Sequence, residues 1–474
     1  MSTQETGDDF GFLSPPSVTV KSWLPHSAIV WGSQQIPDSG PYEYRVQSHL
    51  FSNDHESFDG DVIQKLLSSD LLRRTTQASE RLASVLFPDT AFGFPINEMF
   101  IEKFHGVFLT NAGLIDSSNF STELKSSIFL NQVVSTITKF LHDTKNPVLG
   151  RYQPLRFFSP IHANTPIQGT SLKRKPDVMV ISLVDGHIKK GSMLWPDVQS
   201  FIETTREGRP PIRMKDTIVT KSYLMFCNQP ERDFVISMGI TSQGFKIFLI
   251  DRAGIITTDV IPFNYHNCAL VFIRMVMGLA FLPDSYIGVD ATMNFPKLAT
   301  PGKKFEEAYP PLVVTKTSPS MPVFDARSLP SWLTVHGVEK DDRPTISVGE
   351  QVYPVKSTIF RSQSLVGRGT TVFVVKLPDG TLGVLKDSWN LVKKPTESLA
   401  ITKLDLPFCP RFVDDHHFKN AETARFRTAA RKEALIDETR IKERMVMYPA
   451  GVHISDFSSL WELMIAFLDV IIGA

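Results

Sequence analysis

Residues 365–376 read Leu-Val-Gly-Arg-Gly-Thr-Thr-Val-Phe-Val-Val-Lys, and residues 381–387 read Thr-Leu-Gly-Val-Leu-Lys-Asp. Both runs are rich in β-branched and other strand-forming residues, and residues 377–380 between them (Leu-Pro-Asp-Gly) are typical of a turn. The pattern predicts a glycine loop, a strand, a turn and a second strand that carries Lys386 near its end. Gly367 and Gly369 have no Cβ, so their backbone can approach a phosphate group closely.

The length and composition of the chain indicate which class of protein it is. It has 474 residues, 42% of them hydrophobic, with 50 basic and 50 acidic side chains. The length predicts two to four folded domains, and the balanced charge gives no overall attraction to nucleic acid or to an anionic membrane. The three cysteines are far apart and form no Cys-x-x-Cys pair, which argues against a disulfide framework or a zinc site. With no signal peptide and no long apolar run, we expect an intracellular protein of the cytoplasm or nucleus that does not contact membranes.

The pattern divides the chain into four parts. Residues 1–58 are polar and irregular, and we expect them to be partly disordered. Residues 59–295 alternate helical and strand patterns, as an α/β domain does; residues 296–345 are a linker rich in Pro, Lys and Ser; and residues 346–474 begin with strands. In the α/β domain we predict helices over 62–86, 123–140, 213–227 and 268–281, and strands over 177–182, 198–203, 233–240, 245–250 and 255–261.

The glycine loop is compared with the phosphate-binding loop of protein kinases, Gly-x-Gly-x-x-Gly-x-Val. Gly367 and Gly369 match the first two glycines, but Val372 stands in place of the third. Kinases also need a strand lysine that contacts the α- and β-phosphates and a glutamate on the following helix that pairs with it. Lys386 and Glu397 are the candidates. The alternative is a β-hairpin with solvent-facing glycines and an ordinary surface lysine.

Several short motifs together resemble the fungal-type protein kinase family, and the resemblance runs from about residue 120 to the end. That family couples an α/β domain to a protein-kinase-like domain that transfers phosphate from ATP to protein serine or threonine. The resemblance implies that Gly367 and Gly369 cover ATP, that Lys386 pairs with its phosphates, that Met447 lies in the hinge beside adenine, and that Mg²⁺ is a cofactor. The motifs are residues 174–177 (Arg-Lys-Pro-Asp), 195–198 (Trp-Pro-Asp-Val), 251–254 (Asp-Arg-Ala-Gly), 367–370 (Gly-Arg-Gly-Thr), 386–389 (Lys-Asp-Ser-Trp) and 448–451 (Tyr-Pro-Ala-Gly).

The chain departs from the kinase pattern after the hinge. It has no His-Arg-Asp, and its one Asp-Phe-Gly, at residues 9–11, lies in the polar N-terminal segment, where the motif has no catalytic use. We therefore expect a kinase N-lobe with an incomplete C-lobe, truncated before the catalytic loop, in which ATP binding is retained and phosphotransfer is lost. Such a lobe would expose apolar helices at residues 457–474, around Trp461 and Met464, to a protein partner or a second copy.

A second group of residues suggests a metal site in the α/β domain. Asp177 follows Pro176 at the start of one predicted strand, and Glu203 ends the next, as in the PD-(D/E)XK nuclease core. Two carboxylates on adjacent strands can hold Mg²⁺. Thr205 occupies the place of the motif's lysine, and Lys215 or Lys221 on the next helix could replace it. The alternative is a nuclease-like fold without activity, in which both acids are polar strand-end residues.

The sequence thus predicts an α+β protein with an α/β nuclease-like domain followed by a five-stranded protein-kinase-like N-lobe. Three functions remain open: a kinase-like ATP-binding protein, a non-catalytic scaffold, and a metal-dependent nuclease built on Asp177 and Glu203. His416 and His417 beside Asp414 and Asp415 also suggest a metal site, but adjacent residues on one element point in different directions. We interpret that segment as a polar loop, and residues 418–440, which are dense in Ala, Arg, Lys, Glu and Thr, as a solvated helix or a mobile insertion.

Overall fold

The computed structural model describes residues 74–144, 149–167, 172–183, 193–205, 211–295, 344–362, 364–403, 410–427 and 439–450, together with Leu67, Leu71 and Met464. All of them belong to the unit Asp38–Ala474, and none belongs to the unit Met1–Pro37. The predicted N-terminal segment and the linker, apart from residues 344–345, lie outside the described residues. So do the C-terminal helices, except for Met464, which is exposed.

The α/β region is built on an eight-stranded mixed sheet in the order β1-β7-β6-β5-β4-β3-β2, with β8 paired to β6. All seven residues of β5 are buried, as expected for a central strand that is covered on both faces. The β2-β3-β4 and β5-β6-β7 runs are antiparallel, and β4 is parallel to β5. The strands are β1 (Thr75–Ala78), β2 (Arg156–Ser159), β3 (Val178–Ser182), β4 (Val198–Thr204), β5 (Phe234–Ile240), β6 (Gly244–Asp251), β7 (Gly254–Thr258) and β8 (Ile261–Pro262).

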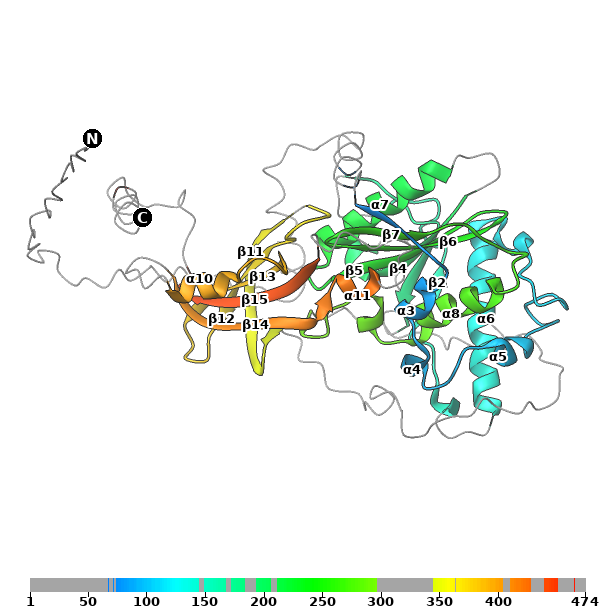
Figure 1. Ribbon diagram of the computed structural model, residues 1–474, viewed down its shortest axis with the longest axis horizontal. Coiled ribbons are helices and arrows are strands. Elements are labelled where there is room, and N and C mark those ends of the chain that lie inside the picture. The colour runs from blue at the N-terminus through cyan, green and yellow to red at the C-terminus, as the bar shows by residue number, and fades with distance from the viewer. Residues whose placement is uncertain are drawn as a thin grey trace, which may run out of the picture. The chain divides into compact units, whose positions relative to one another are not determined.

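Helices cover both faces of this sheet (Figure 1). Helix α6 (Glu123–Asp143), whose first turn is capped by the Thr122 hydroxyl, and α8 (Cys268–Phe281) share one apolar core with alternate residues of β5. Helix α7 (Pro211–Asn228) packs in a second core on the other face. The short helices of this region are α3 (Leu82–Leu86), α4 (Asp89–Phe92) and α5 (Glu98–Glu102).

Most predicted elements of the α/β region are confirmed, but one helix is wrong. Residues 62–86 do not form a continuous helix, because Thr75–Ala78 is the edge strand β1, which pairs in parallel with β7. Thr75 and Thr76 are β-branched residues that suit an edge strand, and β7 supplies the backbone partners that an isolated segment lacks. Leu67 and Leu71 remain helical, and the helical pattern resumes at Leu82.

The second sheet has seven strands in the order β14-β15-β13-β12-β11-β10-β9. Strands β11, β12 and β13 form an antiparallel meander, and α10 (Glu397–Lys403) follows β13. The glycine loop connects β11 to β12, as predicted. The strands are β9 (Met293–Asn294), β10 (Thr345–Val348), β11 (Gln351–Arg361), β12 (Thr371–Lys376), β13 (Leu382–Leu391), β14 (Arg411–Glu422) and β15 (Arg440–Tyr448).

The second sheet differs from the prediction in three respects. It has seven strands rather than five, because β10 and β9 extend one edge. The segment with His416 and His417 is strand β14, so the polar-loop interpretation is wrong. Residues 418–440 are also not one solvated helix: β14 continues to Glu422, and the short helix α11 (Ala424–Arg427) buries Phe426. Cross-strand pairing with β15 explains the difference, because it stabilises a polar segment as a strand.

Taken together, the described residues form a mixed α+β structure with two sheets, and few helices accompany the second, which is consistent with a kinase-like fold. In the described part of the chain, no helix combines the length and the apolar character needed to cross a membrane.

Candidate functional site

Lys386 lies on the third strand of the β11-β12-β13 meander, paired with Val372 on one side and Met445 on the other. Glu397 is the first residue of the helix that follows this strand. The Lys386 Nζ atom lies 2.5 Å from the Glu397 Oε2 atom, so the predicted pair is formed. Both side chains are partly exposed, which leaves the lysine accessible to a ligand.

A second cation shares the same carboxylate. Arg368, which lies between the two glycines of the loop, pairs with the other oxygen of Glu397. Partial burial acts to raise the pKa of Glu397, but hydrogen bonds from Lys386 and Arg368 outweigh it and hold the pKa below its usual value. Two cations on one carboxylate leave a net positive charge, which favours an anionic ligand such as a phosphate.

The glycine loop packs against the turn between β6 and β7. The N–H of Gly367 donates to the carbonyl oxygen of Arg252 at 2.8 Å, and the Arg252 guanidinium donates to the carbonyl oxygen of Ser364, also at 2.8 Å. Leu365 and Val366 are buried among residues of the α/β region. The alternative of a hairpin with solvent-facing glycines does not describe this loop, since Gly369 is itself buried.

Both glycines are required by the backbone. Gly367 has φ +118° and Gly369 has φ +49°, conformations that other residues adopt at a cost. A Cβ at position 369 would lie 2.5 Å from the Arg252 Nε atom, closer than atoms can pack. The loop therefore uses its glycines partly to fit against Arg252. One of its N–H groups, that of Gly367, is already donated to protein and is not free for a phosphate.

Residues 251–254 carry part of the family resemblance, but their pattern predicts no role for them. Asp251 accepts hydrogen bonds from the N–H groups of Ala253 and Gly254, which shapes the turn. Its carboxylate also takes two hydrogen bonds, at 2.6 and 2.8 Å, from the Arg427 guanidinium. The Arg252 guanidinium lies 4.2 Å from the centre of the Phe226 ring. This turn thus holds both the glycine loop and α11.

Met447 lies near the end of β15, between Val384 of β13 and Phe412 of β14. It is half-buried, and the next residue, Tyr448, is exposed. This is one strand away from Lys386, on the strand that ends where the resemblance places a hinge. Its contact with adenine stays a prediction.

The structure also brings Asp177 and Glu203 together. Asp177 precedes β3, and Glu203 lies on the antiparallel neighbour β4. The Asp177 carboxylate accepts hydrogen bonds from the Thr204 N–H at 2.8 Å and from the Thr204 hydroxyl at 3.1 Å. The Asp177 N–H in turn donates to a Glu203 carboxylate oxygen at 3.4 Å.

Of the two lysines proposed to replace the missing one, Lys221 reaches this pair and Lys215 does not. Lys221 forms a buried ion pair with Glu203, whereas the ammonium group of Lys215 donates to the Thr75 hydroxyl. Burial raises the pKa of Glu203 to about 7, against the opposing effect of Lys221 and with a further contribution from the nearby Asp177 carboxylate. An acid that is half-protonated near neutral pH and already paired with a lysine is a weak ligand for Mg²⁺.

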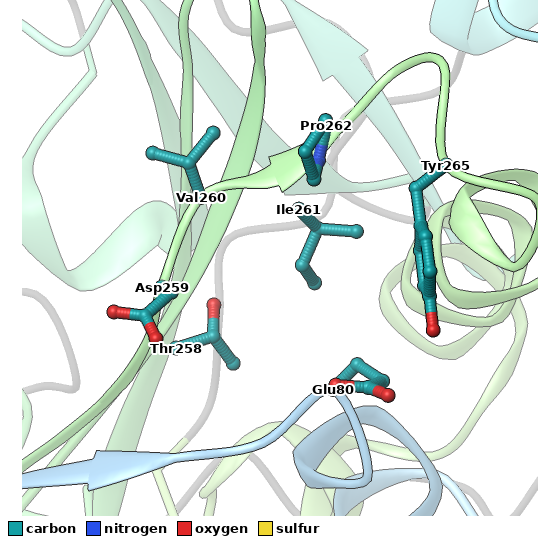
Figure 2. A pocket seen from close by; sticks show the side chains of 7 residues that line it. All are labelled: Glu80, Thr258, Asp259, Val260, Ile261, Pro262 and Tyr265. Atoms are coloured by element: carbon teal, nitrogen blue, oxygen red, sulfur yellow. The ribbon is translucent and has the colours of Figure 1, made fainter.

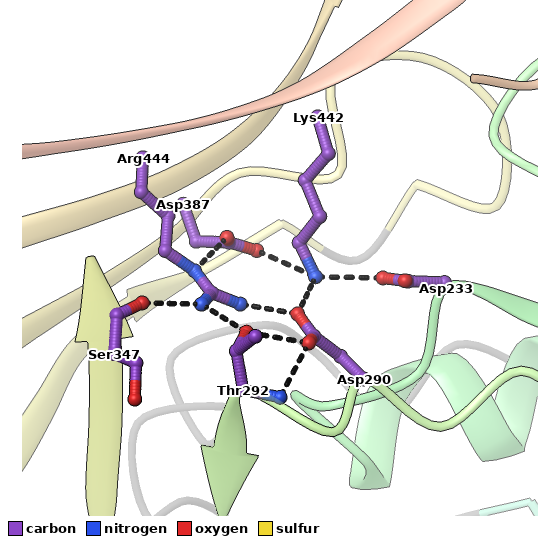
Figure 3. Close-up of polar contacts among 7 residues, drawn as sticks. All are labelled: Asp233, Asp290, Thr292, Ser347, Asp387, Lys442 and Arg444. Atoms are coloured by element: carbon purple, nitrogen blue, oxygen red, sulfur yellow. Dashed lines mark hydrogen bonds and ion pairs between the residues drawn. The ribbon is translucent and has the colours of Figure 1, made fainter. Parts of the chain in front are cut away.

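A buried charge network joins the two sheets (Figure 3). Lys442 of β15 contacts Asp290 at 2.5 Å, Asp233 at 2.6 Å and Asp387 at 3.7 Å. Arg444, two residues further on, contacts Asp290 and Asp387 as well. Burial acts to raise the pKa of Asp290, but the two cations outweigh it and keep the pKa below its usual value. The sequence signal for this network is the spacing of Lys442 and Arg444, which are two residues apart and therefore lie on the same face of the strand.

Figure 2 shows a small pocket of about 150 Å³. It contains none of the predicted site residues. Its lining consists of Glu80, Thr258, Asp259, Val260, Ile261, Pro262 and Tyr265.

Comparison with known proteins supports one family. A family model described as fungal protein kinase matches residues 175–406, a span that runs from just before β3 to just after α10. It includes Asp177, Glu203, both loop glycines and the Lys386–Glu397 pair. No curated protein and no solved structure gave a significant match. Over residues 175–406 the chain is therefore similar to the fungal protein kinase family, which supports the predicted resemblance.

Proposed function

We propose that the second sheet binds ATP and that Lys386 contacts its phosphates. The observation that carries the proposal is the 2.5 Å pair between Lys386 on the third meander strand and Glu397 at the start of the next helix. In protein kinases a strand lysine held by a helix glutamate is the group that positions the α- and β-phosphates. Arg368 adds a second positive charge from the glycine loop.

The residues present fit ATP better than they fit a bound magnesium ion. Glu397 is paired with two cations, and Asp387, next to Lys386, is held by Arg444 and Lys442. Neither carboxylate is free as a metal ligand, so Mg²⁺ enters this proposal as the counter-ion of the nucleotide. The proposal covers nucleotide binding and not phosphotransfer, because the printed sequence contains no His-Arg-Asp.

The test is a thermal-shift titration of the full chain with Mg-ATP. Binding to the folded state raises the melting temperature with ligand concentration. Lys386→Met should reduce the shift at each ATP concentration. The matched control is Lys376→Met, which changes an exposed lysine at the end of the neighbouring strand β12 and should leave the shift intact. No shift in the unmodified chain would refute the proposal.

One observation favours a second candidate function. Asp177, Glu203 and Lys221 meet at adjacent strands and the following helix. We propose metal-dependent cleavage of nucleic acid as the alternative activity of this cluster. Incubation of the chain with DNA and Mg²⁺ or Mn²⁺ tests it. Cleavage that is lost in Asp177→Ala supports it, and intact DNA with the unmodified chain rejects it.

A further inference from the structure

Three side chains that can bind metals converge on strands β14 and β15. Within a strand, residues two apart lie on the same face, so Asp415 and His417 share one face of β14. His417 is directly opposite Glu443 of β15 in the antiparallel register. The His417 Nε2 atom lies 3.4 Å from an Asp415 carboxylate oxygen and 4.0 Å from a Glu443 carboxylate oxygen. One ligand atom from each of the three residues lies within 4.8 Å of the others.

The neighbouring residues of β14 face the other way, which separates the cluster from the rest of the strand. Asp414 accepts a hydrogen bond from the Tyr353 hydroxyl at 2.9 Å. The rings of His416 and Phe418 pack edge to face at 4.5 Å, and Phe418 lies under the Arg444 guanidinium. Adjacent residues of β14 do point in different directions, which excludes Asp414 and His416 from a shared metal site. Asp415 and His417 lie together on the other face.

The charge of the cluster is not balanced by protein cations. The Glu443 side chain is only 3% exposed. Its hydrogen-bond donors are the neutral Asn390 amide and the Ser398 hydroxyl. Within the described residues no lysine or arginine forms an ion pair with it, and His417 is the one titratable nitrogen beside it. A buried carboxylate is costly without a counter-charge, which a metal ion would supply.

The cluster is also open on one side. The Asp415 and His417 side chains are about a third exposed, at 31% and 34%. A metal site needs both an entry path and polar groups that hold its ligands in place. The open side provides the path, and Asn390 and Ser398 hold the buried Glu443 carboxylate.

We propose that Asp415, His417 and Glu443 bind a divalent transition-metal ion, with Zn²⁺ the best fit. Imidazole favours zinc and related metals, whereas Mg²⁺ and Ca²⁺ take oxygen ligands almost exclusively. Zinc ligands at about 2.0–2.1 Å in a tetrahedron lie roughly 3.4 Å apart. His417 and Asp415 already have this separation, whereas the wider separations in the cluster, up to 4.8 Å, must shorten when the ion binds. Three protein ligands leave a position for water or another small ligand, as in an open zinc site. The site does not depend on the nucleotide site proposed above.

The experiment is a titration of the full chain, freed of metal with EDTA and carrying no histidine tag, with Zn²⁺ by calorimetry and with Co²⁺ by visible absorbance. We expect one ion per chain and a Co²⁺ spectrum of four- or five-coordinate nitrogen and oxygen ligation. His417→Ala should weaken binding at least tenfold, and so should Glu443→Gln. His416→Ala and Asp414→Asn are matched controls from the opposite face and should bind as the unmodified chain does.

Two outcomes overturn the proposal. One is the absence of stoichiometric binding by the unmodified chain. The other is an equal effect of His416→Ala and His417→Ala, which would place the metal elsewhere. If Glu443→Gln fails to fold, His417→Ala still decides the question, because His417 is partly exposed and its removal leaves no cavity in the core.

Discussion

Lys442→Met should uncouple the two sheets. Lys442 is 1% exposed and lies between Asp233 and Asp290 of the α/β region and Asp387 of β13 (Figure 3). Methionine has nearly the volume of lysine without the charge, so the substitution removes the ion pairs and preserves the packing. Arg444 still neutralises Asp290 and Asp387 in the variant. Among the described residues, Asp233 is then the carboxylate of this network that loses its direct ion pair.

The size of the effect follows from this arrangement. Removing one partner of a buried ion pair costs about 3–5 kcal/mol, because the other charge stays buried. We expect the lower end, about 3 kcal/mol at pH 7, since Arg444 remains and Asp233 can take up a proton. Burial already raises the pKa of Asp233 to about 6, against the effect of Lys442. The loss of Lys442 raises the pKa of Asp233 further.

The pH dependence provides a second sign to check. An acid whose pKa is higher in the folded than in the unfolded chain stabilises the fold more as pH falls. Asp233 has a higher pKa in the variant than in the unmodified chain, so the free energy of unfolding of the variant rises more when the pH falls from 7 to 5. The destabilisation should therefore shrink by about 1 kcal/mol, given about 1.4 kcal/mol per unit of pKa difference.

Urea unfolding followed by far-UV circular dichroism measures the change. With a slope of about 3 kcal/mol per molar, a loss of 3 kcal/mol lowers the midpoint by about 1 M. Lys394→Met, at an exposed lysine, is the control and should stay within about 0.5 kcal/mol. An unchanged midpoint in Lys442→Met, or a destabilisation that grows as the pH falls, would refute the reasoning.

Two further substitutions test other parts of the molecule. Gly369→Ala should destabilise the chain by about 1–3 kcal/mol because of the positive φ of Gly369 and the close approach of Arg252. Gly150→Ala is the control and should change stability little, because a Cβ there meets nothing within 4 Å. Equal midpoints of the two variants in thermal unfolding would contradict the description of the glycine loop as packed against Arg252. Glu203 has a folded pKa of about 7, above its unfolded value, so the unmodified chain should gain about 2 kcal/mol on going from pH 7 to pH 5. Glu203→Gln should lack this gain, and parallel stability profiles for the two chains would show that Glu203 does not titrate as described.

The parts of the structure that local pattern determines could be predicted from the sequence. The helices over α6, α7 and α8 show clear periodicity, and the strands around them are bounded by turn residues. The Lys386–Glu397 pair could also be predicted, because a strand followed closely by a helix brings these two positions together. Asp177 and Glu203 could be paired because they end consecutive strands.

The parts that depend on contacts distant in the sequence could not be predicted. Strand β1 forms only because β7, about 180 residues later, offers an edge to the Thr75–Ala78 segment. The hydrogen bonds between Arg252 and the glycine loop span more than a hundred residues. The alternation of β14 would have paired Asp415 with His417, but only once that polar segment was recognised as a strand held by β15.

The most direct test of the nucleotide site compares ligands that differ only in their phosphates. Isothermal titration should show that Lys386→Met weakens ATP binding by tenfold or more, since hydrogen bonds to charged groups contribute about 1.5–3 kcal/mol, and that it leaves adenosine binding unchanged. Equal ATP affinities of Lys386→Met and the unmodified chain would contradict the claim that Lys386, held by Glu397, contacts the phosphates.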